Sequence, residues 1–342
     1  MLRHRLFQTF FIVSCFLFFS CSKNRKQDYS IELSLSGLEP EFIAEYQSYN
    51  VSLENPAVIR VYSDSLVLIS ERKSSVLLRM VDINSGNCVD SLARGRGPEE
   101  FLSAWDITVI NKDIVVHDIL RKRVSVFRPD SLSFFDVIGQ FDVKENYLRI
   151  IPSPIGGYVA LPNTRYRMVL LSDDGTPCDT IGTFPQMNGD ERAINNTAAQ
   201  SQIVFSSSGD YFCSTFLSMN CIEIYLQDSL RVRLLGPGKT KSTVMRSVVS
   251  GGVMYTIKPA IRVFSGSSAS DSGFMVGFAG EKDNDIHDFK GVKELLLFDW
   301  SGKCLERYLL PFRVLSFDVD WPHRKVFAIT AESEPRLVSL SF

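Results

Sequence analysis

Short apolar runs separated by polar turns recur along almost the whole chain. Polar turns at residues 84–86 (Asn-Ser-Gly), 173–175 (Asp-Asp-Gly) and 300–302 (Trp-Ser-Gly) each follow one apolar run and precede another. The runs are rich in Val, Ile, Leu and Phe, which is typical of β-strands, and the period of about 3.6 residues that marks an amphipathic helix is nearly absent. The pattern therefore predicts an all-β protein of antiparallel strands.

The expected strands fall into groups of four. The first two groups are expected at residues 58–63, 66–70, 76–83 and 87–92, and at 105–110, 114–118, 124–127 and 134–143. Further groups are expected to begin near Tyr147, Ile203, Ile261 and Val314. Six groups over residues 50–342 give about 49 residues each, which is the repeat length of a propeller blade. Because one four-stranded sheet cannot bury both of its faces, we expect a six-bladed β-propeller rather than the alternative of two packed sandwiches.

The last group contains only three expected strands, which leaves its outer position open. Residues 29–35, with alternating Ile31, Leu33 and Leu35, have the pattern of a half-buried edge strand. We therefore expect this N-terminal strand to complete the last blade and to close the ring. The propeller is expected to occupy residues 29–342, and its fifth blade has the least regular pattern because residues 237–273 contain many turn residues.

Residues 1–21 have the features of a secretory signal peptide: a basic start, an apolar stretch at residues 10–19, and a closing Ser20-Cys21. The apolar stretch is shorter than the roughly 20 residues that a membrane-spanning helix needs. Residues 18–21 (Phe-Phe-Ser-Cys) resemble a bacterial lipobox, which implies lipidation of Cys21, and the polar residues 22–28 would then form a tether. An ordinary cleaved signal peptide or a membrane anchor is the alternative.

A glycine-rich segment at residues 94–101 (Arg-Gly-Arg-Gly-Pro-Glu-Glu-Phe) follows the strand expected to end near Leu92. It resembles the G-x-G-P-x-E-F signature of the TolB-like six-bladed propellers of Bacteroidota lipoproteins, with residues 235–238 as a degraded copy. The matching positions are Gly95, Gly97, Pro98, Glu100 and Phe101. We expect the two glycines to take positive φ in a sharp turn between blades. Together with the leader and the number of blades, the resemblance covers nearly the whole mature chain and implies a propeller in the cell envelope, without a substrate.

Basic residues follow Cys21, at Lys23, Arg25 and Lys26. In the lipoproteins that this leader resembles, an acidic run at this place accompanies display on the cell surface. The resemblance therefore implies an outer-membrane lipoprotein on the periplasmic side, with its lipid as the only contact with the membrane.

Composition places the chain among ordinary globular proteins, with 45% hydrophobic residues, 22% charged residues and a net charge of −2. Nucleic-acid binding is not expected, because it calls for a basic excess. Five cysteines follow Cys21, and an odd number argues against a complete disulfide framework. Cys88, Cys178 and Cys304 occupy one repeat position in different blades and should be unpaired, whereas Cys213 and Cys221 could face each other across a hairpin as a disulfide or as two packed thiols.

No motif in the sequence specifies a cofactor, a metal or a catalytic group, and none is expected. Residues 236–240 end like a phosphate-binding loop, but Arg233 stands where that loop needs a glycine. The acidic residues 283–288 lack the glycine and the final glutamate of an EF-hand. Four charged residues are expected on or near innermost strands, at Asp106, Arg149, Asp318 and Asp320. They could serve a propeller hydrolase, lactonase or lyase, with Asp106 or Asp318 as the reacting group, or they could line a water-filled channel.

Charged turn residues segregate between the two faces of the predicted disc. The face that carries the second-to-third turns and the links between blades is basic, with Arg72, Lys73, Arg94, Arg96, Arg121, Lys122, Arg123, Arg165 and Arg167, together with Lys239 and Lys241. The opposite face is acidic, with Asp64, Asp113, Asp130, Asp173, Asp174 and Asp228. A basic face attracts anionic ligands or an acidic partner, although turns also carry charge for solubility alone. The sequence thus favours a non-enzymatic binding or scaffolding module for an envelope protein or glycan.

Overall fold

The described part of the computed structural model comprises residues 30–97, 100–104, 106–130, 133–185, 188–189, 195–196, 198–237, 243–249, 252–258, 262–279 and 289–342. Within it, residues Ile31–Phe342 form one compact unit. The expected signal peptide, Cys21 and the tether lie outside the described residues. No helix that could serve as a membrane span occurs among the residues described.

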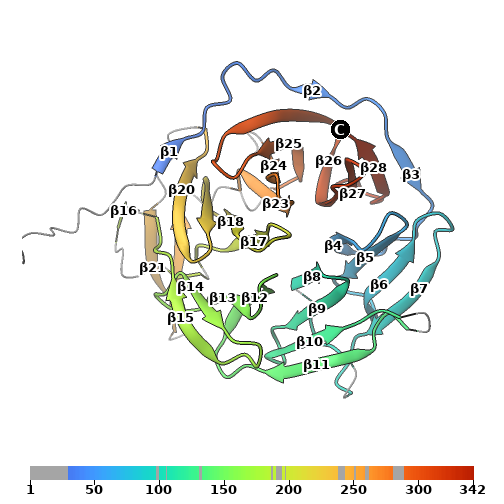
Figure 1. The fold of residues 1–342 in the computed structure, drawn as a ribbon, viewed down its shortest axis with the longest axis horizontal. Helices are drawn as coiled ribbons and strands as arrows, with labels where there is room; N and C mark the ends of the chain where they lie inside the picture. The colour runs from blue at the N-terminus through green and yellow to red at the C-terminus, as the bar shows by residue number, and fades with distance from the viewer. Residues whose placement is uncertain are drawn as a thin grey trace, which may run out of the picture. The chain divides into compact units, whose positions relative to one another are not determined.

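Four sheets each contain a blade of four antiparallel strands that follow one another in the chain (Figure 1). Blade 1 consists of β4 (Pro56–Val61), β5 (Leu66–Glu71), β6 (Val76–Asp82) and β7 (Cys88–Ala93), and blade 2 of β8 (Asp106–Ile110), β9 (Asp113–Asp118), β10 (Arg123–Phe127) and β11 (Val137–Asp142). Blade 3 consists of β12 (Tyr147–Pro152), β13 (Tyr158–Pro162), β14 (Met168–Leu171) and β15 (Pro177–Ile181), and blade 4 of β17 (Ser201–Phe205), β18 (Tyr211–Phe216), β19 (Cys221–Leu226) and β20 (Ser229–Leu235). The four-strand groups expected from the sequence are confirmed.

Two further blades share one long strand, β26 (Cys304–Asp320). Its first half pairs with β25 (Val292–Phe298) and its second half with β27 (Lys325–Thr330), so that blades 5 and 6 form a single eight-stranded sheet. Blade 5 is completed by β23 (Phe264–Ala269) and β24 (Phe274–Phe278), and blade 6 by β28 (Leu337–Ser341) and β3 (Gln47–Tyr49).

Six clusters of buried apolar side chains join each blade to the next. Representative members are Leu68 with Ile107 (blades 1 and 2), Val115 with Ile150 (2 and 3), Ile151 with Ile203 (3 and 4), Ile224 with Phe264 (4 and 5), Leu295 with Phe317 (5 and 6), and Phe327 with Ile59 (6 and 1). Because a middle strand is buried on both faces, it contains a continuous apolar run, such as the first four residues of β5 (Leu-Val-Leu-Ile). The last cluster joins the sixth blade to the first and closes the ring.

The N-terminal segment follows the outer edges of three blades, as the blue part of Figure 1 shows. β1 (Ser30–Glu32) pairs with β20 of blade 4, β2 (Glu41–Phe42) pairs with β26, and β3 pairs with β28 of blade 6. A strand before the first blade therefore completes the last one, as expected. The expected segment, residues 29–35, was wrong: its described part lies on blade 4, where the amide of Leu33 donates to the carbonyl oxygen of Leu235 (2.7 Å).

A small additional sheet accounts for the irregular pattern of residues 237–273. It consists of the hairpin β21 (Thr243–Val249) and β22 (Gly252–Lys258), with β16 (Asn188–Gly189) parallel to β21. This hairpin precedes β23, and blade 5 begins at Phe264, close to the start expected near Ile261.

All five cysteines of the propeller are free thiols. Cys88, Cys178 and Cys304 each lie at the start of a fourth strand, as their repeat position predicts. Cys213 pairs in register with Ile224, so the hairpin does not place it opposite Cys221, and the disulfide alternative is wrong. Burial raises the pKa of the Cys304 thiol to about 11 and the pKa of the Cys213 thiol still further.

Candidate binding site in the central channel

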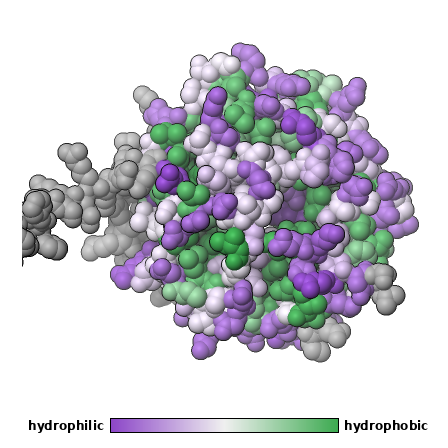
Figure 2. Space-filling view, in the orientation of Figure 1, coloured by the Kyte–Doolittle hydropathy of each residue, from purple (hydrophilic) through white to green (hydrophobic). Residues whose placement is uncertain are grey.

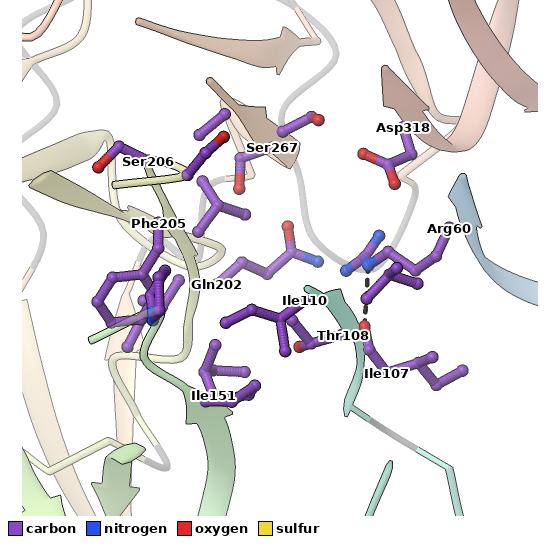
Figure 3. Close-up of a pocket in the computed structure, with 18 of the residues that line it drawn as sticks. Arg60, Ile107, Thr108, Ile110, Ile151, Gln202, Phe205, Ser206, Ser267 and Asp318 are labelled. Carbon is purple, nitrogen blue, oxygen red and sulfur yellow. Dashed lines mark hydrogen bonds between the residues drawn. The ribbon is translucent and has the colours of Figure 1, made fainter. Parts of the chain in front are cut away.

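A cavity of about 270 Å³ lies in the centre of the ring. Residues of the first strands of all six blades line it: β4, β8, β12, β17, β23 and the second half of β26. Figure 3 shows the side chains of Arg60, Gln202, Ser267 and Asp318 around this opening. A pocket of this kind, at the axis of a closed ring, is the first place to look for a ligand.

Two charged side chains of the cavity are fixed by the backbone of neighbouring blades. The Arg60 guanidinium donates from Nε to the carbonyl oxygen of Ile107 (2.9 Å) and from Nη1 to its neighbour Ile59 (2.9 Å). The Asp318 carboxylate accepts from the amide of Val61 through Oδ2 (2.9 Å). Blades 6, 1 and 2 therefore hold both groups in place before any ligand arrives.

A second pair of charges lies where blades 2 and 3 meet. The Arg149 guanidinium donates to Oδ1 of Asp106, whose side chain is 2% exposed. His117 lies directly opposite Asp106 in the β8–β9 ladder, with Nδ1 at 3.7 Å from Oδ2 of Asp106. That separation exceeds a hydrogen bond, and neither atom has a partner among the described residues. Arg149 thus balances the carboxylate charge.

Uncharged polar side chains complete the lining. Oε1 of Gln202 accepts from the amide of Gly266 (3.0 Å), so the side-chain nitrogen Nε2 of Gln202 points toward the cavity. Ser267 is 4% exposed, and its Oγ has no hydrogen-bond partner within the described chain. The indole of Trp321 donates from Nε1 to Oγ of Ser268 (3.2 Å). Arg60, Gln202 and Ser267 were missed in the sequence. Arg60 is a charged residue in the otherwise apolar strand β4, whereas Ser267 lies in the serine-rich strand β23 and gives no such signal.

Each carboxylate in or near the cavity has a partner of its own. Asp106 is paired with Arg149 and Asp318 with backbone amides, and Asp320 does not line the cavity, since its Oδ2 contacts Nδ1 of His323 (2.8 Å). The residues described contain no cluster of three or more His, Cys, Asp and Glu that could hold a metal ion. The acidic segment 283–288, Lys239 of the phosphate-loop-like segment and Lys241 lie outside the described residues.

Arg94 belongs to the link between blades 1 and 2. Its guanidinium donates to the carbonyl oxygens of Ser74, Leu102, Glu71 and Arg72 (2.9–3.0 Å). Four of the five N–H groups of this guanidinium thus donate to the backbone and brace the turn, which leaves one N–H for the binding role expected of Arg94.

Arg167 is wholly buried, which corrects its expected place on the basic face. Its Nε donates to Glu223 of blade 4 (2.9 Å), and Arg233 donates to the other carboxylate oxygen (2.9 Å). Further N–H groups of Arg167 donate to Asn196, Ser201 and Ser214. The guanidinium also lies over the ring of Phe216 at 4.4 Å. We call Arg167, Glu223 and Arg233 the buried Arg–Glu network, which joins blades 3 and 4.

The other predicted basic residues lie at the surface. Arg123 is paired with Asp142 (3.0 Å). Arg96, Lys122 and Arg165 are exposed and Arg121 is half-exposed, and we call these four residues the basic rim. The rim belongs to blades 1 to 3 and their links. Figure 2 shows hydrophilic and hydrophobic residues interspersed on the face that it draws.

Positive charge extends from the basic rim toward the channel. Arg262 precedes β23, and its pKa is lowered first by burial and then by the positive charges of Arg72 and Arg149. Its Nε has no hydrogen-bond partner among the described residues, and its guanidinium lies over the ring of Phe289 at 4.8 Å. Because Arg149 is already balanced by Asp106, Arg72 and Arg262 extend the positive charge of the basic rim, which favours an acidic or electron-rich partner there.

The glycine-rich motif is a structural link. The Glu100 carboxylate accepts from the amide of Gly97 (2.5 Å), and Phe101 is 3% exposed and packs against Phe127. A Cβ at Gly95 would lie 2.1 Å from the Glu100 carboxylate. Neither glycine has positive φ, so the expected reason for them was wrong: the Glu100 side chain occupies the space that a Cβ would need. Pro98 lies outside the described residues.

The profile of the TolB-like 6-blade propeller-like family matches residues 44–321. The chain belongs to this family. The match covers blades 1 to 5 of the TolB-like propeller and, in blade 6, only β3 and β26. No match was found among curated proteins.

Solved structures similar to this TolB-like propeller share little sequence with it. A Bacteroides fragilis protein described as exported has a TM-score of 0.56 at 12% identity, over 91% of this chain and 98% of that one. The β-propeller domain of Cps50 (Swd1) from Myceliophteria thermophila has a TM-score of 0.50 at 8% identity, over 87% and 100% of the two chains. U3-55K has a TM-score of 0.51 at 9% identity, over 89% and 100%. At these identities the likeness shows the fold alone.

Proposed function

We propose that this TolB-like propeller is a non-enzymatic binding or scaffolding module of the cell envelope that holds a protein or a glycan. In this proposal Cys21 carries a lipid that anchors it on the periplasmic side of the outer membrane, and the basic rim and the channel face the partner. The leader sequence and the likeness to an exported protein support the location.

The observation that carries the proposal is the state of the carboxylates in the channel. Asp106 is paired with Arg149 of blade 3 and Asp318 accepts from the amide of Val61 of blade 1, so each carboxylate already has a structural partner, which argues against either one as the general acid or base of a hydrolase. The arginines and apolar side chains between them suit recognition instead. No feature of the described residues favours the hydrolase, lactonase or lyase alternative.

The test is capture of a partner from envelope extract by the full chain. We expect wild-type protein to retain a partner, and a variant with Arg96→Glu, Lys122→Glu and Arg165→Glu to lose most of it, because the rim reverses its charge. A matched variant with Lys112→Glu, Arg128→Glu and Lys303→Glu carries the same change in charge at exposed turns of the opposite face. Equal retention by the two variants, or no retained partner, would count against the proposal.

A further inference from the structure

We propose that the central cavity binds an uncharged sugar residue of a glycan, through Arg60, Gln202, Ser267 and Asp318. This inference rests on the proposed function, since it names the ligand that one site of the module takes. Three properties of the cavity support this ligand: the charge of its lining, its free hydrogen-bonding groups and its size.

The charge of the lining excludes a strongly charged ligand. Two cations, Arg60 and Arg149, and two anions, Asp106 and Asp318, line the cavity and sum to zero. A phosphate or a carboxylate would be attracted by the two arginines but repelled by the two carboxylates. A protonated amine would be attracted by the carboxylates but repelled by the arginines. A ligand without net charge avoids both costs.

The groups left free in the cavity are matched to hydroxyls. Among the described residues, Nη2 of Arg60 and Nε2 of Gln202 have no hydrogen-bond partner, so both can donate. Each oxygen of the Asp318 carboxylate accepts from one backbone amide, Val61 or Val319, and retains a further lone pair. The buried Ser267 hydroxyl can donate or accept. Neighbouring hydroxyls of a sugar donate to a carboxylate and accept from arginine or an amide, which uses all four groups at once.

The volume of the cavity and its apolar wall fit one sugar ring. About 270 Å³ corresponds to about nine waters at about 30 Å³ each, and it lies near the lower end of ligand pockets. Val109, Ile110 and Val204 line the cavity and are half-buried, so they supply an apolar wall against which the C–H face of a ring can pack. A folded protein domain could not enter, whereas one residue at the end of a glycan could.

Binding can be followed directly because Trp321 lines the cavity. The full chain, purified in a detergent without sugar headgroups, is presented to immobilised neutral oligosaccharides and to a matched set that contains uronic acids. We expect retention of neutral oligosaccharides, and a change in tryptophan fluorescence when the retained sugar is titrated in solution.

Two nearly isosteric variants test the site without removing side-chain volume. Gln202→Glu keeps the acceptor for Gly266 but replaces the free donor with a charge, and Asp318→Asn removes the charged acceptor. Each is expected to weaken binding by about tenfold or more, because each removes or inverts a buried hydrogen bond. Gln140→Glu and Asp142→Asn, on the outer strand β11, are the matched controls and should leave the affinity within about twofold.

Three results would overturn the inference: no neutral sugar is retained, only acidic sugars are retained, or the channel variants bind as the wild type does. Capture of an envelope partner through the basic rim in the same preparation would then show that the proposed function stands while the sugar assignment fails. Loss of both would remove the proposed function as well.

Discussion

Glu223→Ala is expected to lower the free energy of unfolding by about 3–5 kcal/mol, because it leaves two buried guanidinium groups without a counter-charge. Glu223 is fully buried and bridges Arg167 and Arg233, and it also accepts from the Tyr225 hydroxyl (3.0 Å). Urea unfolding of the wild type and of Glu223→Ala measures the difference in their free energies of unfolding.

Glu294→Ala is the matched control for this substitution. Glu294 also pairs with an arginine, Arg307, but both side chains are partly exposed, so we expect a loss of about 1 kcal/mol or less. Equal losses for the two variants would contradict the role given to the buried Arg–Glu network.

Tyr49→Ala is expected to destabilise the propeller by about 3–5 kcal/mol, which is the usual cost of deleting a large buried ring. Tyr49 lies on β3, the strand that completes blade 6, and is 9% exposed. Its hydroxyl is within hydrogen-bonding distance of Oγ of Ser339 (2.8 Å), and its ring packs near Phe327. Loss of this side chain weakens the contact between the N-terminal segment and the last blade.

Tyr46→Ala serves as the control three residues earlier. Tyr46 is 44% exposed, so the same truncation should cost about 1 kcal/mol or less. Thermal unfolding of Tyr49→Ala and Tyr46→Ala compares the stability that each variant loses. A Tyr49→Ala protein as stable as Tyr46→Ala would show that β3 does not close the ring.

The strand pattern predicted the blades because each blade repeats the same burial. Their inner and middle strands are apolar on both faces, and polar turns separate them, so the groups could be counted from the sequence. The choice of closing strand could not be predicted. Alternation at Ile31 and Leu33 marks an edge strand, but the outer edges of blades 4, 5 and 6 offer similar backbone hydrogen bonds.

The candidate site was predicted only in part, because side-chain direction in a turn is not encoded locally. Arg167 and Arg165 lie in the same turn, yet one is buried and the other exposed, and the difference comes from Glu223, 56 residues away. Asp106, Arg149 and Asp318 were found because a charge in an innermost strand is conspicuous, and the same signal at Arg60 was overlooked. Gln202 and Ser267 carry no charge and became recognisable only when six strands met at one axis.

The most direct test of the binding-module account is photo-crosslinking in living cells. A photoreactive amino acid in place of Lys122, in the basic rim, is expected to give a defined adduct with an envelope component. The same substitution at Asp228, exposed on the opposite face, is expected to give none. An adduct at Asp228 alone, equal adducts at both positions, or no adduct at either would contradict the account.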